Sequence, residues 1–200
     1  MMLPQKQWYD SSAADPEEVK RLCREWKTNP YVAEILIRRG YKTSEEIKSF
    51  LIPELINLRD PYELRQMREA VDLLQETIAS NRRIVILGDY DVDGITATAL
   101  MLEFLNKCGK LDLDFFIPNR IKHGYGLTEA STDILLEMRP ELVITVDNGI
   151  TAALEVQRLN DAGIKTIITD HHLADPGLLP SGIVVNPNHP ECKYPFKKIS

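Results

Sequence analysis

The 200-residue sequence has no apolar run near the ~20 residues that a membrane-spanning helix needs, so we expect no membrane partner. Its first ten residues, MMLPQKQWYD, lack the basic start and apolar core of a signal peptide. Cysteine is scarce, and Cys23, Cys108 and Cys192 form no CxxC unit, which argues against a disulfide framework or a zinc site. We expect the cysteines to pack as small apolar side chains in a reducing cytoplasm.

Positive charge is also in short supply, because 24 Lys and Arg against 30 Asp and Glu give a formal net charge of −6. A net negative charge argues against a protein that binds nucleic acid over its whole surface, although it is compatible with a local basic groove. The apolar content of 44% and charged content of 27% are typical of globular proteins. The length suits one domain, or one domain with a smaller companion.

The pattern of residues divides the chain near residue 80. Residues 1–80 predict a small helical region with no catalytic motif. Three of its helices have typical start signals: Asp15 before Pro16, Asn29 before Pro30, and Thr43 with Glu46 as a capping box. An amphipathic helix over 67–80 completes this region.

Residues 81–200 alternate between strand and helix patterns. Strands are predicted at about 84–88, 112–117, 142–146, 165–169 and 183–186. Helices are predicted between them at about 94–108, 128–138 and 151–162. Strands that are apolar throughout indicate a parallel sheet covered on both faces. The sequence therefore predicts an α/β fold with a doubly wound, mainly parallel sheet.

Acidic and imidazole side chains follow three of these predicted strands. The first strand is followed by GDYDVDG, the third by a single aspartate and the fourth by a triplet: Asp89, Asp91 and Asp93; Asp147; and Asp170, His171 and His172. The carboxyl ends of parallel strands share one edge of a sheet, so these side chains should meet there. Crowded carboxylates repel one another unless a cation neutralises them, and hard divalent metals prefer oxygen ligands. The pattern predicts a metal site.

Other interpretations of these motifs remain open. An EF-hand loop starting at Asp89 would place Gly94 correctly, but Leu100 stands where a bidentate glutamate is needed. The acidic triplet could also be solvated turn residues without a metal. Asp147 could lie in a plain turn, and one histidine of the pair could cap the following loop. The combination of three strand ends favours the metal site.

The motifs DYDVDG, VDNG and TDHH resemble motifs I, II and III of the DHH phosphoesterase superfamily. Within it, the chain is similar to the RecJ single-strand-specific 5′→3′ exonucleases, also over NPYVAEILIRRG, IPNRIKHGYGL and VNPNHPECKYPF. The resemblance implies a hydrolase that digests single-stranded DNA to mononucleotides in DNA repair and recombination. It implies two Mn²⁺ or Mg²⁺ ions as cofactors, and other repair or replication proteins as further partners.

The same resemblance implies roles for individual residues. The metal ligands would be Asp91, Asp93, Asp147 and His171. Asp89 would be a further ligand or a base behind the ligands. His172 would face the phosphate as a donor or as an acid to the leaving oxygen, and Asp170 would orient a histidine rather than bind metal.

Two residues outside these motifs are expected to contact DNA. Arg120 follows the second strand, and its guanidinium suits a phosphate, although a surface ion pair is the alternative. Tyr125 lies between two glycines and could stack on a base, although it could instead anchor its loop. His123 and His189 are expected to be solvated loop side chains.

The sequence departs from the family pattern in two ways. Leu87 stands where many members of the superfamily have a histidine that can bind metal. The aspartate of a fourth motif and the further domains of RecJ would fall after residue 200, so we expect an N-terminal fragment that binds metal weakly and cuts DNA poorly or not at all. Two alternatives remain: a phosphoesterase acting on short oligonucleotides, cyclic dinucleotides or pyrophosphate, and a non-catalytic scaffold in a replication assembly.

Overall fold

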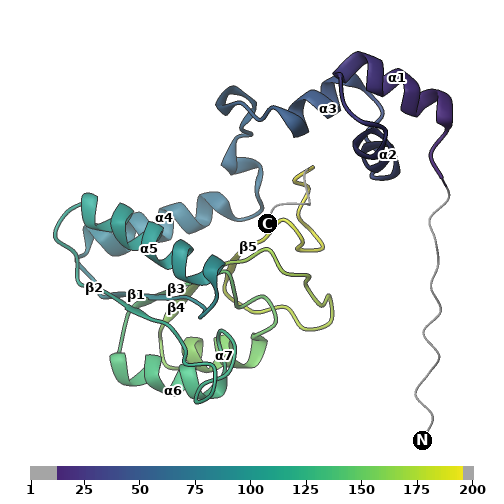
Figure 1. The fold of residues 1–200 in the computed structure, drawn as a ribbon. Helices are drawn as coiled ribbons and strands as arrows, with labels where there is room; N and C mark the ends of the chain where they lie inside the picture. The colour runs from purple at the N-terminus through teal and green to yellow at the C-terminus, as the bar shows by residue number, and fades with distance from the viewer. Residues whose placement is uncertain (1–12, 196–200) are drawn as a thin grey trace, which may run out of the picture. The chain divides into compact units, whose positions relative to one another are not determined.

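The computed structural model describes residues 13–195 and divides the chain into two compact units, Met1–Arg59 and Asp60–Ser200 (Figure 1). The stretch inspected for a signal peptide and Phe196, the last residue of the RecJ-like tail, lie outside the described residues. No helix among the described residues combines the length and apolarity needed to cross a membrane.

The first unit contains three helices, α1 (Pro16–Trp26), α2 (Pro30–Arg38) and α3 (Ser44–Leu51). They begin where the sequence predicts, because Asp15 and Asn29 accept backbone hydrogen bonds from the first turns of α1 and α2. The predicted capping box of Thr43 is also formed. Four buried residues form the small core of this unit: Leu22, Ala33, Leu36 and Ile47.

The second unit begins earlier than the boundary expected near residue 80. It includes the short 3₁₀ helix η2 (Pro61–Glu63) and helix α4 (Met67–Ala79), whereas the 3₁₀ helix η1 (Leu55–Asn57) precedes the division. Ala70 of α4 is buried in the core of the sheet, and Leu74 packs against it. The apolar face of α4 therefore covers the sheet, which explains why the helix belongs with the strands that follow it.

Five parallel strands form one sheet in the order β2-β1-β3-β4-β5. The strands are β1 (Ile84–Leu87), β2 (Leu113–Phe116), β3 (Leu142–Val146), β4 (Lys165–Thr169) and β5 (Ile183–Val185). The crossover helices are α5 (Val92–Lys107), α6 (Glu129–Met138) and α7 (Ala153–Asp161). Helices α4 and α5 cover one face, and α6 and α7 cover the other (Figure 1). The predicted doubly wound fold is confirmed.

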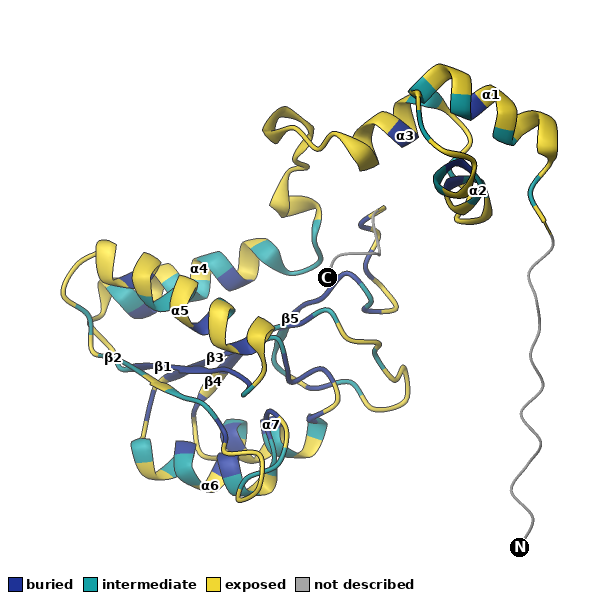
Figure 2. Ribbon diagram, in the orientation of Figure 1, coloured by how far each residue is buried: buried dark blue, intermediate teal, exposed yellow. Residues whose placement is uncertain are grey.

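The strands are apolar throughout because both faces of the sheet are covered. Along β1, Val85 and Leu87 belong to one core cluster, and Ile84 and Ile86 belong to the other. All four residues of β1 and all five of β3 are buried, as Figure 2 shows. The central strands therefore contribute alternate side chains to two separate cores, one on each face of the sheet.

The cysteines meet their expectation only in part. Cys192 is buried and Cys23 is half-buried, as expected for small apolar side chains. Cys108 is exposed, because it is the C-cap that follows the last residue of α5, and its side chain turns back to the carbonyl of Phe104. The expectation was therefore wrong for Cys108.

The topology places a switch point, the position at which α/β folds form a ligand crevice, at the carboxyl ends of the central strands. From β1 the chain crosses to β2 on one side, whereas from β3 it crosses to β4 on the other. Because the connections after β1 and β3 leave in opposite directions, the carboxyl ends of these two parallel strands form the position where α/β folds bind ligands. The loop after β1 carries Asp89, Asp91 and Asp93, and the turn after β3 carries Asp147.

Candidate metal centre

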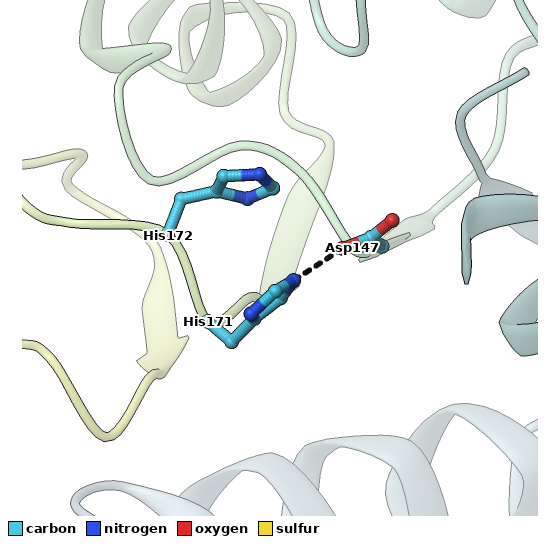
Figure 3. Close-up of side chains that lie close together, drawn as sticks. All are labelled: Asp147, His171 and His172. Carbon is cyan, nitrogen blue, oxygen red and sulfur yellow. Dashed lines mark hydrogen bonds and ion pairs between the residues drawn. The ribbon is translucent and has the colours of Figure 1, made fainter. Parts of the chain in front are cut away.

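Asp147, His171 and His172 form a close cluster at this crevice (Figure 3). One potential ligand atom from each of the three lies within 4.8 Å of the others. His171 Nε2 lies 2.8 Å from Asp147 Oδ1, which links the ends of β3 and β4. The register of these neighbouring strands, in which Val146 pairs with Thr169, explains why motifs distant in sequence meet here.

The backbone at Asp147 adopts the left-handed conformation, with φ of 64°. Aspartate and asparagine tolerate this region better than most residues, and the turn aims the carboxylate at the crevice. The Asp147 N–H donates to the carbonyl of Thr169 at 2.9 Å. Burial raises the pKa of Asp147; its hydrogen bond with His171 opposes this shift, and the charge of Asp91 adds to it.

Asp170 lies behind the histidines with its carboxylate buried. Oδ1 lies 2.7 Å from His172 Nδ1 and accepts the backbone N–H groups of His171 and His172. Oδ2 accepts the N–H of Ile150 at 3.0 Å. Burial alone would lower the pKa of His172, but its hydrogen bond with Asp170 and the charges of Asp170, Asp147 and Asp91 together raise that pKa. A proton on Nδ1 leaves Nε2 facing the crevice.

Tyr125 reaches the same place from the loop after β2. Its hydroxyl lies 3.2 Å from His172 Nε2 and donates to the carbonyl of Asp147 at 3.3 Å. Burial and four nearby carboxylates raise the pKa of Tyr125, so the hydroxyl stays protonated. The residue is still 45% exposed. The structure therefore gives Tyr125 a contact with a candidate catalytic histidine that its sequence position alone does not reveal.

A row of aromatic and cationic groups extends from Tyr125 along the crevice. The rings of Tyr90 and Tyr125 meet edge to face at 6.0 Å, and the Arg120 guanidinium lies 5.7 Å from the Tyr90 ring. Sequence reasoning missed Tyr90. Its place between two acids in GDYDVDG was the available signal, because a side chain in that loop must lie at the carboxyl end of β1.

The acidic triplet after β1 divides into one buried and two exposed residues. Asp89 is fully buried, and its Oδ1 accepts the N–H of Gly126 at 3.1 Å. Its Oδ2 has no hydrogen-bond partner among the described residues. Asp91 is the N-cap of α5 and accepts the N–H of Gly94 at 3.0 Å. Asp91 and Asp93 are exposed, and the charge of Asp91 acts on Asp147 and His172.

Asn148 connects the two strand ends that carry these acids. Its Nδ2 donates to the carbonyls of Leu87 at 3.3 Å and Val146 at 2.9 Å. Asn148 is 1% exposed, so this bridge lies beneath the site rather than in it. Sequence reasoning treated the VDNG motif as a source of Asp147 alone and missed the amide beside it.

The two histidines expected to be solvated loop side chains both accept hydrogen bonds within their loops. His189 is 5% exposed, its Nδ1 accepts the N–H of Glu191, and burial lowers its pKa. The Nδ1 of His123 accepts the N–H of Asn119 at 3.0 Å, and its ring packs against Phe116. The expectation was wrong for His189, which is buried, whereas His123 stays half-exposed although its imidazole accepts a hydrogen bond within the loop.

A family model described as "DHH family, N-terminal domain" matches residues 83–197. The chain is 38% identical over 199 residues to the single-stranded-DNA-specific exonuclease RecJ of Bacillus subtilis (strain 168), covering 100% of this chain and 25% of that protein. It is 31% identical over 172 residues to RecJ of Escherichia coli (strain K12), covering 86% and 29%. The chain thus spans about a quarter of the length of these relatives.

Two solved structures are similar to this chain. The crystal structure of exonuclease RecJ bound to manganese matches with a TM-score of 0.61 and 37% identity, covering 67% of this chain and 34% of that one. RecJ in complex with Mn²⁺ from Thermus thermophilus matches with a TM-score of 0.65 and 32% identity, covering 92% and 25%. The resemblance drawn from the motifs is confirmed by these matches.

Proposed function

This chain belongs to the DHH family, and we propose that it provides the metal-binding edge of an exonuclease that digests single-stranded DNA from the 5′ end. The observation that carries the proposal is the convergence of Asp147, His171 and His172 on one sheet edge, beside Asp91. The similarity to RecJ over the full length of the chain supports the same reaction class.

The residues at this edge fit a divalent metal. A carboxylate and two imidazoles within 4.8 Å of one another are a donor set that suits Mn²⁺ and, less closely, Mg²⁺. The buried Oδ2 of Asp89, without a donor among the described residues, is an atom whose charge a cation would balance. The solved RecJ structures that match this chain contain manganese.

We assign the ligands from the motifs and the geometry together. Asp91, Asp93, Asp147 and His171 would hold two Mn²⁺ or Mg²⁺ ions, with Asp89 as a further ligand or as a base behind them. Asp91 can do so while it caps α5, because its Oδ1 accepts Gly94 N–H and leaves Oδ2 for a cation. When bound, such ions stabilise charge on the phosphoryl oxygens and lower the pKa of a coordinated water.

His172 is the residue that would donate a hydrogen bond or a proton to the leaving oxygen. Asp170 holds its Nδ1, so its Nε2 faces the crevice, where it meets the Tyr125 hydroxyl. A substrate oxygen that displaced this contact would receive a hydrogen bond or a proton from Nε2. Asp170 would act only through His172, because its oxygens are engaged with the histidines and Ile150.

Single-stranded DNA would enter along the row of Arg120, Tyr90 and Tyr125. Tyr125 is 45% exposed, which leaves part of its ring open to a base. Arg120 is exposed, and a guanidinium suits a phosphate oxygen. Other repair or replication proteins as partners, and a cytoplasmic location, stay predictions of the sequence.

An exonuclease assay with an isosteric substitution tests this proposal. The full-length gene product would be given 5′-phosphorylated single-stranded DNA and the matching duplex, with Mn²⁺. We expect mononucleotides from the single strand alone, and their loss in Asp147→Asn, because asparagine keeps the left-handed backbone but removes the charge.

Asp133→Asn is the matched control, because it makes the same change at a surface ion pair with Arg158 on α6 and α7. It should digest the single strand as the wild type does. No digestion of either DNA by the full-length wild-type gene product would reject the exonuclease and direct the test to dinucleotides and pyrophosphate. Full activity of Asp147→Asn would reject the metal site.

A further inference from the structure

Two asparagines after β5 hold the backbone of the histidine pair from behind. Asn186 is fully buried, and its Nδ2 donates to the carbonyl of His172 at 3.1 Å. Asn188, which is partly buried, donates its Nδ2 to the carbonyl of His171. These contacts join segments 14 and 17 residues apart in sequence.

The orientation of the Asn186 amide follows from its partners. Its Oδ1 accepts the N–H of Asn188 at 2.7 Å, so the other end of the amide must be the donor that faces the His172 carbonyl. The surrounding backbone is tied as well, because the N–H of Asp170 donates to the carbonyl of Val185 at 3.2 Å. A carboxylate at position 186 could accept from Asn188, but it would repel the His172 carbonyl.

We propose that Asn186 and Asn188 are positioning residues that set where the imidazoles of His171 and His172 lie. Asp170 holds the N–H groups of both histidines, and the two asparagines hold their carbonyls. Each histidine is therefore fixed on both sides of its Cα atom. Metal ligands must be held to about 0.5 Å, and such bracing supplies that precision.

The chemistry of the amide explains why neutral residues stand here. Two carbonyls need donors, and a lysine or arginine would add positive charge behind a cation site. A neutral amide donates a hydrogen bond without changing the net charge around the metal site. The catalytic consequence of this bracing rests on the proposed function, whereas its effect on the histidine rings does not.

Isosteric substitutions in this chain test the bracing. Asn186→Asp and Asn188→Asp each remove the donor and keep the shape. Asn160→Asp is the matched control, because its amide donates to Ser181, and it lies at the end of α7. We would measure Mn²⁺ affinity by calorimetry, the Nδ1–H resonance of His172 by NMR, and thermal stability by circular dichroism.

We expect Mn²⁺ affinity to fall about 10- to 100-fold in both variants and to stay unchanged in Asn160→Asp. The direction is informative, since added negative charge near the site would by itself tighten cation binding. We also expect the His172 Nδ1–H signal to shift or broaden, because its geometry with Asp170 changes. Loss of stability without that shift would indicate a merely structural role and overturn the proposal.

The other outcomes of these measurements also support or refute the bracing by Asn186 and Asn188. Unchanged or tighter Mn²⁺ binding with unchanged ring signals in both variants would refute the bracing. If Asn186→Asp fails to fold, the partly buried Asn188→Asp carries the same test. If the wild-type chain binds no Mn²⁺, the proposed function loses its metal site, and the ring signals alone judge the bracing.

Discussion

Substituting Gly126 by alanine should destabilise the protein more than the same change at an open glycine turn. Gly126 has φ of 60°, and a Cβ there would lie 2.8 Å from Asn148 Cβ. Asn148 cannot easily move aside, because its amide is tied to the carbonyls of Leu87 and Val146. The left-handed backbone costs alanine roughly 1–2 kcal/mol, and overpacking adds about 1–3 kcal/mol.

Gly163→Ala separates these two contributions. Gly163 has φ of 80°, and nothing lies within 4 Å of the position that its Cβ would occupy. Urea unfolding followed by far-UV circular dichroism should therefore show a loss of roughly 1–2 kcal/mol for Gly163→Ala, and a further loss of about 1–3 kcal/mol for Gly126→Ala. Equal losses for the two variants would refute the close approach of the Tyr125 loop to Asn148.

Substitutions at two further residues, Asp91 and His189, test how stability depends on the α5 cap and on pH. Asp91→Asn should keep the hydrogen bond that caps α5 and the stability of the protein, but it should lose Mn²⁺ affinity. Asp91→Ala should lose both, with a free energy of unfolding in urea lower by about 1 kcal/mol. Equal stability of the two variants would contradict the capping role. Burial, aided by the charge of Arg65, lowers the pKa of His189, so the unfolded chain binds the proton first as the pH falls. Stability from this group is therefore complete above about pH 6.5 and is lost below it, by at most about 1.4 kcal/mol per pH unit. His189→Gln should flatten that part of the urea-midpoint profile, and an identical profile would show that His189 does not contribute.

Local signals made the elements of this fold readable from the sequence. The helix caps at Asp15, Asn29 and Thr43 act within a single turn, and the unbroken apolar run of β1 predicts that the strand is buried on both faces. The meeting of acids and histidines at one edge also followed, because parallel topology alone brings strand ends together. These inferences needed no knowledge of which side chains touch.

Contacts between loops could not be predicted from the sequence. The sequence indicated that Asp170 would orient a histidine, and the structure places it on His172. The burial of His189 and the hydrogen bond from Asn186 to His172 depend on how the segment after β5 folds under the histidine turn. The amphipathic pattern of α4 could not reveal the surface it covers, because an apolar stripe is the same whichever core receives it.

The strand order also decides when the site can exist during synthesis. β3, which Asp147 follows, pairs with β1 before it and β4 after it, and the histidine turn is supported by residues as late as Asn188. A ribosome that has delivered only β1 to β3 has therefore made Asp91 and Asp147 without the imidazoles that complete the cluster. The completed cluster therefore cannot assist those early steps, and the nascent sheet pairs through apolar contacts and backbone hydrogen bonds before the histidines arrive.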